Sequence, residues 1–463
     1  MQVLQYIVDL GPSVMLPLVI FIIGLVLRRG FSKSLVSGLT IGVGFVGIGL
    51  VISLLTDSLG PAAEGMADRF DVGLSVVDIG WPGASPMAWA STMGLIAIPV
   101  AIVVNLIMLV AKMTRVVNVD IWNIWHMAFT GIIVQIATGS VIWGIVGVAA
   151  HAAIAYKLGD IFGPVTERYF GLEGVAIPHG TSTYMGIFAV PIDDLLNKIP
   201  GVRKINLTTE KLEKRMGVIG QPIVVGSLLG LIIGLLAGYE IGPSLQLGVQ
   251  MGAVILLMPM VVKLIMQGLM PIAESARSLL QKKFKNADYR IGLDPALLLG
   301  DQQVVAAGLL FVPLTIIIAV LMPGNEMLPF GDLATIGFFI AIAVGVHRGN
   351  IFRTLISGIF IIAMTLWIAT QTVQLHTQLA EETGLLGNAS RVGSLDQGGS
   401  PITYLLANGL SLQFGIGFIV IAVLFIGAFT YTYFKYKQDT LYPEDVPAEP
   451  EVAPADVPEG SKK

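Results

Sequence analysis

The chain has 463 residues, of which 54% are hydrophobic and only 13% are charged. Soluble domains carry about 25% charged residues, so this composition excludes an ordinary soluble protein. The formal net charge is −4, and we expect no nucleic-acid partner. There is no cysteine, which excludes disulfides, thiolate nucleophiles and cysteine metal sites, and we expect neither a metal nor a cofactor.

Apolar windows with almost no charge recur along the chain. With their flanks they reach the roughly 20 residues that a helix needs to cross a bilayer. The fold class is therefore an all-α polytopic membrane protein. The N-terminus has no basic segment followed by a small-residue cleavage site, so we expect no removable signal peptide. The clearest windows lie at 14–26, 95–111, 223–237 and 414–428.

Basic residues gather in short loops, which stay on the cytoplasmic side of a membrane. Placing these loops inside predicts about eleven transmembrane helices, with the N-terminus outside and the C-terminus in the cytoplasm. Arg69, Lys157 and Arg168 fall on the outside in this arrangement. The basic clusters lie at 28–33, 112–115, 203–215, 277–290, 347–353 and 435–437.

An internal repeat divides the chain into transmembrane halves at 1–205 and 218–437, joined by a charged amphipathic linker at 206–217 in the cytoplasm. The charge pattern places corresponding segments on opposite sides, as in inverted-repeat transporters, whose sites lie between broken helices. Residues 438–463 form an acidic, proline-rich cytoplasmic tail that is predicted to be disordered. The repeat pairs IGWP at 79–82 with IGLDP at 291–295, Asp120 with Asp332, and GTSTY at 180–184 with GSPITY at 399–404.

Two stretches of the first half combine polar groups with aromatic ones. GWPGASPMAWAS at 80–91 contains Trp81 and Ser85, and it predicts either a re-entrant hairpin facing a cavity or a surface turn. NVDIWNIWHM at 118–127 follows Asp120 with Trp122 and His126, which share one face of a helix. Carboxylate and imidazole groups beside an indole suit a sugar or polyol, whereas tryptophans alone would suit the membrane interface.

The stretch LEGVAIPHGTSTYMG at 172–186 carries Glu173 and His179 in strongly apolar sequence. Ionisable groups at bilayer depth face a partner or a wet cavity. The turn around His179 frees backbone groups, and Gly180 and Thr181 follow it directly. Glu173 or His179 is a candidate proton acceptor.

The second half offers a similar set. GLDPALLLGDQQ at 292–303 has acidic residues that serve either as helix caps or in the site, and Asp332 is either an N-cap or a ligand for hydroxyls. SLDQGGSPITY at 394–404 supplies Asp396 and Gln397. We expect 172–186 and 394–404 to form opposite walls of one polar pocket. His151 and His376 are isolated in the sequence and receive no role.

Several catalytic motifs are absent. The chain has no GxxxxGK[ST] phosphate loop, no HExxH and no GxSxG, so neither ATP hydrolysis nor a membrane-embedded enzyme is supported. The residues alone leave two kinds of transporter open. One is coupled to phosphoryl transfer, and the alternative is a proton-coupled secondary transporter of a polyol or related solute, using Glu173, His179 and Asp120 as a relay.

Long stretches of the chain resemble the galactitol permease enzyme IIC components of the bacterial phosphoenolpyruvate:sugar phosphotransferase system, from about Gln5 to Phe434. The acidic tail is not part of the resemblance. The stretches are VDIGWPGASPM, TRVVNVDIWNIWHM, LEGVAIPHGTSTYMG, IGLDPALLLG, LPFGDLATIGFF, VGVHRGNIFRTLISG and DQGGSPITYLL.

The resemblance implies uptake of galactitol across the bacterial inner membrane and its release inside as a phosphate ester. Phosphoryl groups would pass from phosphoenolpyruvate through HPr and IIA to a cysteine of IIB. The IIC chain would be the membrane component of this phosphotransferase complex and carry no phosphorylated residue. The related ascorbate permease implies a homodimer in which a mobile core moves past a static scaffold, as an elevator.

The resemblance also places twelve residues around the polyol. Their carboxylates would accept hydrogen bonds from hydroxyl groups, because galactitol is neutral. The substrate-binding candidates are Trp81, Ser85, Asp120, Trp122, His126, Glu173, His179, Gly180, Thr181, Asp332, Asp396 and Gln397.

Overall fold

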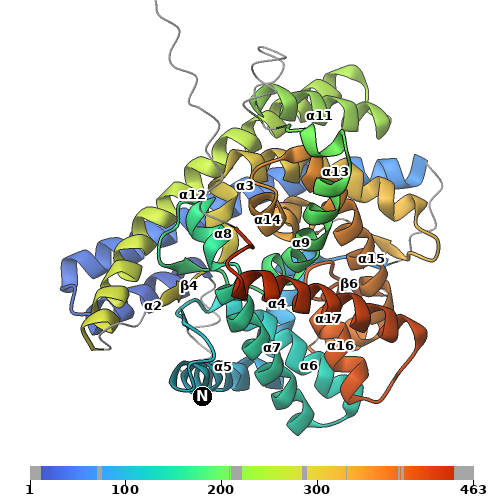
Figure 1. Cartoon of the computed structure of the whole chain (residues 1–463). Coiled ribbons are helices and arrows are strands. Elements are labelled where there is room, and N and C mark those ends of the chain that lie inside the picture. Colours follow the sequence, from blue (N-terminus) through green and yellow to red (C-terminus); the bar gives the residue numbers. More distant parts are fainter. Residues whose placement is uncertain are drawn as a thin grey trace, which may run out of the picture.

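The computed structural model describes residues 12–69, 76–207, 209, 222–283, 289–329, 331–383, 386 and 391–442. Helices dominate this part of the chain (Figure 1). Most of the linker and the tail from residue 443 lie outside the described residues. Five helices are long and apolar enough to cross a bilayer, which confirms the polytopic helical class: α5 (Thr92–Val110), α7 (Val141–Ile161), α13 (Gln302–Leu321), α15 (Ile351–Glu382) and α17 (Ile416–Lys437).

Shorter helices, two very long ones and six short strands complete the described chain. The remaining helices are α2 (Pro12–Val26), α3 (Phe31–Arg69), α4 (Gly80–Ala90), α6 (Trp122–Thr138), α8 (Gly163–Arg168), α9 (Ser182–Lys198), η1 (Val202–Lys204), α11 (Pro222–Leu236), α12 (Ile241–Lys283), η3 (Pro295–Gly300), η4 (Leu333–Thr335), α14 (Ile336–Val346) and α16 (Pro401–Leu410). The strands are β1 (Val76–Asp78), β2 (Val116–Asn118), β3 (Val175–Ala176), β4 (Arg290–Gly292), β5 (Met327–Leu328) and β6 (Val392–Gly393).

The long helices α3 and α12 lie side by side and antiparallel (Figure 1). Gly47 of α3 faces Val261 of α12, and Gly268 of α12 faces Ile41 of α3. The missing Cβ atoms let the two backbones approach closely, which is how helices associate in membranes. α2 packs on α3 and α11 packs on α12, so each half of the chain contributes one long and one short helix to this bundle.

The six strands were not expected in an all-α protein. They pair in parallel into two sheets, with β1 between β5 and β6, and β4 between β2 and β3. Each sheet therefore takes its central strand from one half of the chain and both edge strands from the other. Strands of two or three residues are too short to show the alternating pattern by which sequence reveals a strand.

The segment at 80–91, expected to be re-entrant or a turn, contains helix α4, which begins two residues after β1. Its 11 residues span about 16 Å, roughly half of the hydrocarbon core. Gly80 is required at the turn, because its φ is +62° and a Cβ there would lie 2.4 Å from the carbonyl carbon of Gly331.

Basic side chains gather where α17 ends. Arg115 donates to the Tyr436 hydroxyl at 2.8 Å, and Lys157 lies 5.8 Å from the ring centre of Tyr433. Arg168 donates to the backbone carbonyl of Tyr442. The placement of Lys157 and Arg168 on the opposite side from the other clusters was therefore wrong. Helix α7 returns the chain from the far end of α6 to the end at which Arg115 and the last turns of α17 lie.

Candidate functional site

The carboxyl ends of β1, β5 and β6 meet at Asp332, whose side chain is fully buried. Its Oδ1 accepts a hydrogen bond from the backbone N–H of Trp81 at 2.8 Å. Its Oδ2 accepts from the backbone N–H of Asp396 at 2.8 Å and from the Ser394 hydroxyl at 3.0 Å. The carboxylate thus joins turns from both halves of the chain, and it makes no side-chain cap at the start of η4.

Asp78, the last residue of β1, holds the same turns from the other side. Its Oδ1 accepts from the backbone N–H groups of Gly80 and Leu395, and its Oδ2 accepts from that of Asp332 at 2.9 Å. Sequence reasoning assigned Asp78 no role in the site. The available signal was an acid two residues before a Gly-Trp-Pro turn.

A matching arrangement occurs at the second sheet. Asp120 Oδ2 accepts from the backbone N–H of Asp294 at 3.1 Å, while its Oδ1 accepts from Trp122 N–H at 2.9 Å. Asp294 and Trp81 each precede a proline. Asp120 and Asp332 therefore accept from equivalent backbone N–H groups, each in the opposite half of the chain. Asp294 also caps η3 by accepting from Ala296 N–H, one of the two roles that the sequence allowed.

Five buried side chains meet between these two sheets, and we call them the polar cluster: His126, His179, Thr181, Asp396 and Gln397. The Thr181 hydroxyl donates to Asp396 Oδ1, which also accepts from Gln397 Nε2 at 3.1 Å. His126 Nε2 lies 3.5 Å from Asp396 Oδ2. The turns at 177–181 and 394–400, expected to be opposite walls of one pocket, are therefore in direct contact.

The two histidines of the cluster pack perpendicular to each other, with ring centres 4.1 Å apart. His179 Nδ1 accepts from the backbone N–H groups of Thr181 at 3.2 Å and Ser182 at 3.4 Å. Neutral His179 therefore carries its proton on Nε2, which lies 4.0 Å from Asp294 Oδ2. The Nε2–H group of His179 is thus a hydrogen-bond donor on the side of the ring that faces Asp294.

Aromatic rings border the cluster. Trp81 and Trp122 make an edge-to-face contact with ring centres 5.8 Å apart, and Trp125 packs on His126. Ser85 is buried on α4, which packs against α6. Indole faces beside carboxylate, amide and imidazole groups can contact both the C–H groups and the hydroxyls of a polyol.

Known proteins match this chain along most of its length. Residues 6–387 match the family model described as the PTS system sugar-specific permease component. The chain belongs to this family. It is 58% identical over 425 residues to the "PTS system galactitol-specific EIIC component" of Escherichia coli (strain K12), covering 92% of this chain and 94% of the relative. The same values hold for the protein of that name in Escherichia coli O157:H7.

A more distant relative is the "Putative permease IIC component" of Escherichia coli (strain K12). It is 38% identical over 428 residues, covering 91% of this chain and 98% of the relative. Such coverage means that most of both halves of this permease lies within the shared region.

Glu173 is the one predicted site residue that the structure leaves exposed. It lies between α8 and β3, before the chain enters the second sheet, whereas His179 lies beyond that sheet. The expectation that Glu173 shares a buried pocket with His179 is not met. Glu173 and His179 are only six positions apart in the sequence, which suggested a shared pocket. Strand β3 lies between them and carries the chain from the surface to the interior.

Several buried polar atoms in and beside the cluster have no hydrogen-bond partner in the described structure: His126 Nδ1 and Nε2, Gln397 Oε1 and, one turn before His126, Asn123 Oδ1. An unsatisfied buried group costs about 1–3 kcal/mol. These atoms include both donors and acceptors, so the permease is suited to a ligand with several hydroxyl groups.

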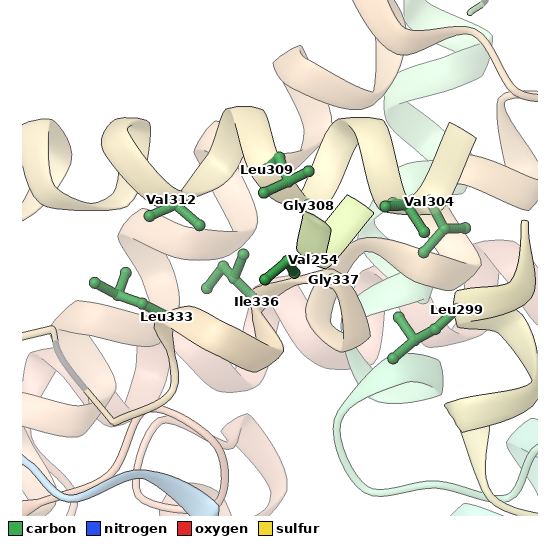
Figure 2. A pocket seen from close by; sticks show the side chains of 10 residues that line it. Val254, Leu299, Val304, Gly308, Leu309, Val312, Leu333, Ile336 and Gly337 are labelled. Carbon is green, nitrogen blue, oxygen red and sulfur yellow. The ribbon is translucent and has the colours of Figure 1, made fainter. Parts of the chain in front are cut away.

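A separate cavity of about 40 Å³ lies between η3, α13 and α14 (Figure 2). Its lining is apolar and includes Val254 of α12, Leu299 of η3 and Ile336 of α14. Beside it, Gly308 of α13 meets Gly337 of α14. The cavity therefore marks an apolar boundary between the long helices and the strand-containing part of the permease, and not the polar site.

Gly180→Ala is expected to reduce ligand affinity at least about tenfold, because the new Cβ would lie 2.9 Å from both His126 Cβ and His151 Nε2. The clash would displace the 177–181 turn from Asp396. Gly242→Ala is the matched control, since its Cβ would meet no atom within 4 Å. Isothermal titration of the purified permease with a polyol measures both, and equal affinities would contradict the packing described at Gly180.

Proposed function

We propose that this permease takes up galactitol through the inner membrane and delivers it to phosphorylation by a separate IIB protein. The observation that carries this function is the polar cluster, where the turns at 177–181 and 394–400 meet and buried atoms of His126 and Gln397 have no hydrogen-bond partner in the described structure. The 58% identity to galactitol-specific components supports galactitol as the polyol.

Each group in the cluster has a role toward a bound polyol. Asp396 accepts hydrogen bonds from hydroxyls, and charged acceptors make the stronger bonds, of about 1.5–3 kcal/mol each. Gln397 and His126 both donate and accept, while Trp81 and Trp122 contact the carbon chain. Asp120 and Asp332 act indirectly, since their oxygens are occupied by backbone N–H groups that hold the turns.

Phosphoryl transfer requires the reacting hydroxyl to lose its proton. Of the two acceptors suggested by the sequence, Glu173 is exposed, and His179 has Nδ1 occupied by two backbone N–H groups and its proton on Nε2, so neither is placed to take this proton. The resemblance implies that a cysteine of IIB, charged in turn by IIA and HPr, supplies the phosphoryl group, and a chain without cysteine fits this division of roles. The basic end around Arg115, Lys157 and Arg168 supports a cytoplasmic position for the C-terminus of α17, with the N-terminus outside.

The transport motion in this function is an elevator movement. The antiparallel helices α3 and α12 would be the scaffold, and the two sheets with their helices the mobile core. The exchange of strands between the halves supports an inverted repeat at 1–205 and 218–437. The apolar boundary in Figure 2 supports sliding, because apolar contacts are not directional. The homodimer rests on the resemblance alone.

The test uses proteoliposomes containing the purified full-length permease. With phosphorylated IIB enclosed, we expect external galactitol to accumulate inside as galactitol phosphate, and we expect no accumulation with unphosphorylated IIB. Uptake that proceeds equally without IIB, and that stops when the proton gradient is collapsed, would instead establish the proton-coupled alternative.

A further inference from the structure

A buried chain of hydrogen bonds lies behind the polar cluster. His151 of α7, Thr130 of α6 and Thr403 of α16 are all fully buried. His151 Nδ1 lies 2.7 Å from the Thr130 hydroxyl, which lies 2.8 Å from the Thr403 hydroxyl. We call these three residues the relay. Sequence reasoning assigned none of them a role.

The relay reaches both turns of the site. Thr403 lies in the first turn of α16, directly after the 394–400 turn that carries Asp396. At the other end, a Cβ placed on Gly180 would lie 2.9 Å from His151 Nε2, so the imidazole packs on the back of the turn that carries Thr181. The Thr181–Asp396 contact joins the same two turns at the front.

The donor and acceptor directions of the two hydrogen bonds in the relay depend on each other, because both bonds share the Thr130 hydroxyl. The Thr130 hydroxyl has one proton and two neighbours, so it donates to one and accepts from the other. If it donates to His151, then Thr403 donates to Thr130. If His151 donates from Nδ1, Thr130 donates to Thr403. In both cases His151 Nε2 has no hydrogen-bond partner in the described structure, and it contacts the Gly180 backbone only by packing.

We propose that His151 is a positioning residue of the polyol site, whose relay through Thr130 to Thr403 sets the spacing of the two turns. This role rests on the proposed polyol function and names a part of the site that touches no substrate. Burying three polar side chains together costs free energy unless they hydrogen-bond to one another, as Thr130 does to both His151 and Thr403. If these three positions served only to fill space in the core, Leu and Val side chains would fill it equally well.

Equilibrium binding of galactitol to the purified full-length permease tests the relay without IIB. We expect His151→Leu and Thr403→Val each to weaken affinity about tenfold, since each breaks the same chain of bonds. The double variant should also lose about tenfold, and not about a hundredfold, because residues of one network are not additive. Thr403→Ser keeps the hydroxyl and should bind within about twofold of wild type.

Thr315→Val is the matched control. Thr315 is fully buried on α13, and its hydroxyl has no hydrogen-bond partner in the described structure, so affinity should not change. Thr403→Val and Thr403→Ser keep the experiment decisive if His151→Leu does not fold. Wild-type affinity in Thr403→Val, additive losses in the double variant, or an equal loss in Thr315→Val would each overturn the relay. Absence of galactitol binding by the wild type would overturn the proposed function itself.

Discussion

Asp332→Ala is expected to abolish galactitol uptake and to leave little folded permease. The substitution strands three buried donors, on Trp81, Ser394 and Asp396. At about 1–3 kcal/mol each, their loss approaches the whole stability of a typical domain, about 5–15 kcal/mol. Asp332→Asn keeps the shape and one acceptor oxygen, so folded protein should survive with uptake below about 1% of wild type.

The measurements are galactitol uptake by cells and the yield of monodisperse protein. Glu326→Gln is the control, because Glu326 lies just before the strand that leads to Asp332 and pairs with Arg391 at 2.6 Å on the surface. Exposed ion pairs contribute about 0–1 kcal/mol, so this variant should transport normally. Uptake above half of wild type in Asp332→Asn would show that the carboxylate does not hold the two turns together.

His179→Ala is expected to lower galactitol affinity about a hundredfold while the protein still folds. The ring is the acceptor for the Thr181 and Ser182 N–H groups at the start of α9, and its Nε2–H faces the site. Removing it therefore loosens the turn and deletes a direct donor to the polyol. Titration calorimetry gives the affinity, and thermal unfolding reports whether the fold is retained.

Glu173→Gln provides the comparison for His179→Ala. Because Glu173 is exposed before β3, we expect its affinity for galactitol to remain within about twofold of wild type. A large loss in Glu173→Gln with no loss in His179→Ala would restore the pocket that the sequence alone suggested, and it would remove His179 from the site.

The correspondence between Asp120 and Asp332 could be predicted from sequence. Each follows a short strand and accepts from the residue before a proline in the other half of the chain. Proline, glycine and acid at fixed spacing leave a visible pattern even where overall identity between halves is low. The likeness of 172–186 to 394–404 led to the expectation that they form opposite walls of one pocket, and the structure places turns from the two stretches in direct contact.

Other parts of the site depend on long-range pairing and could not be predicted. β1 is completed by strands some 250 and 315 residues later along the chain, and no local pattern records such partners. His151 is an isolated histidine in an apolar helix, and only the packing of α7 against α6 and α16 brings it to Thr130 and Gly180. The exposure of Glu173 likewise depends on where β3 enters the second sheet.

The exchange of strands has a consequence for biogenesis. When the ribosome has released only the first 205 residues, β1 has no neighbour on either side, and β2 and β3 lack the strand that separates them. Backbone N–H and C=O groups without hydrogen-bond partners are not stable in contact with lipid. These segments must therefore stay in contact with water or a chaperone until the later strands are synthesised. Neither half is a self-sufficient unit, and insertion of the two into the membrane has to be completed jointly.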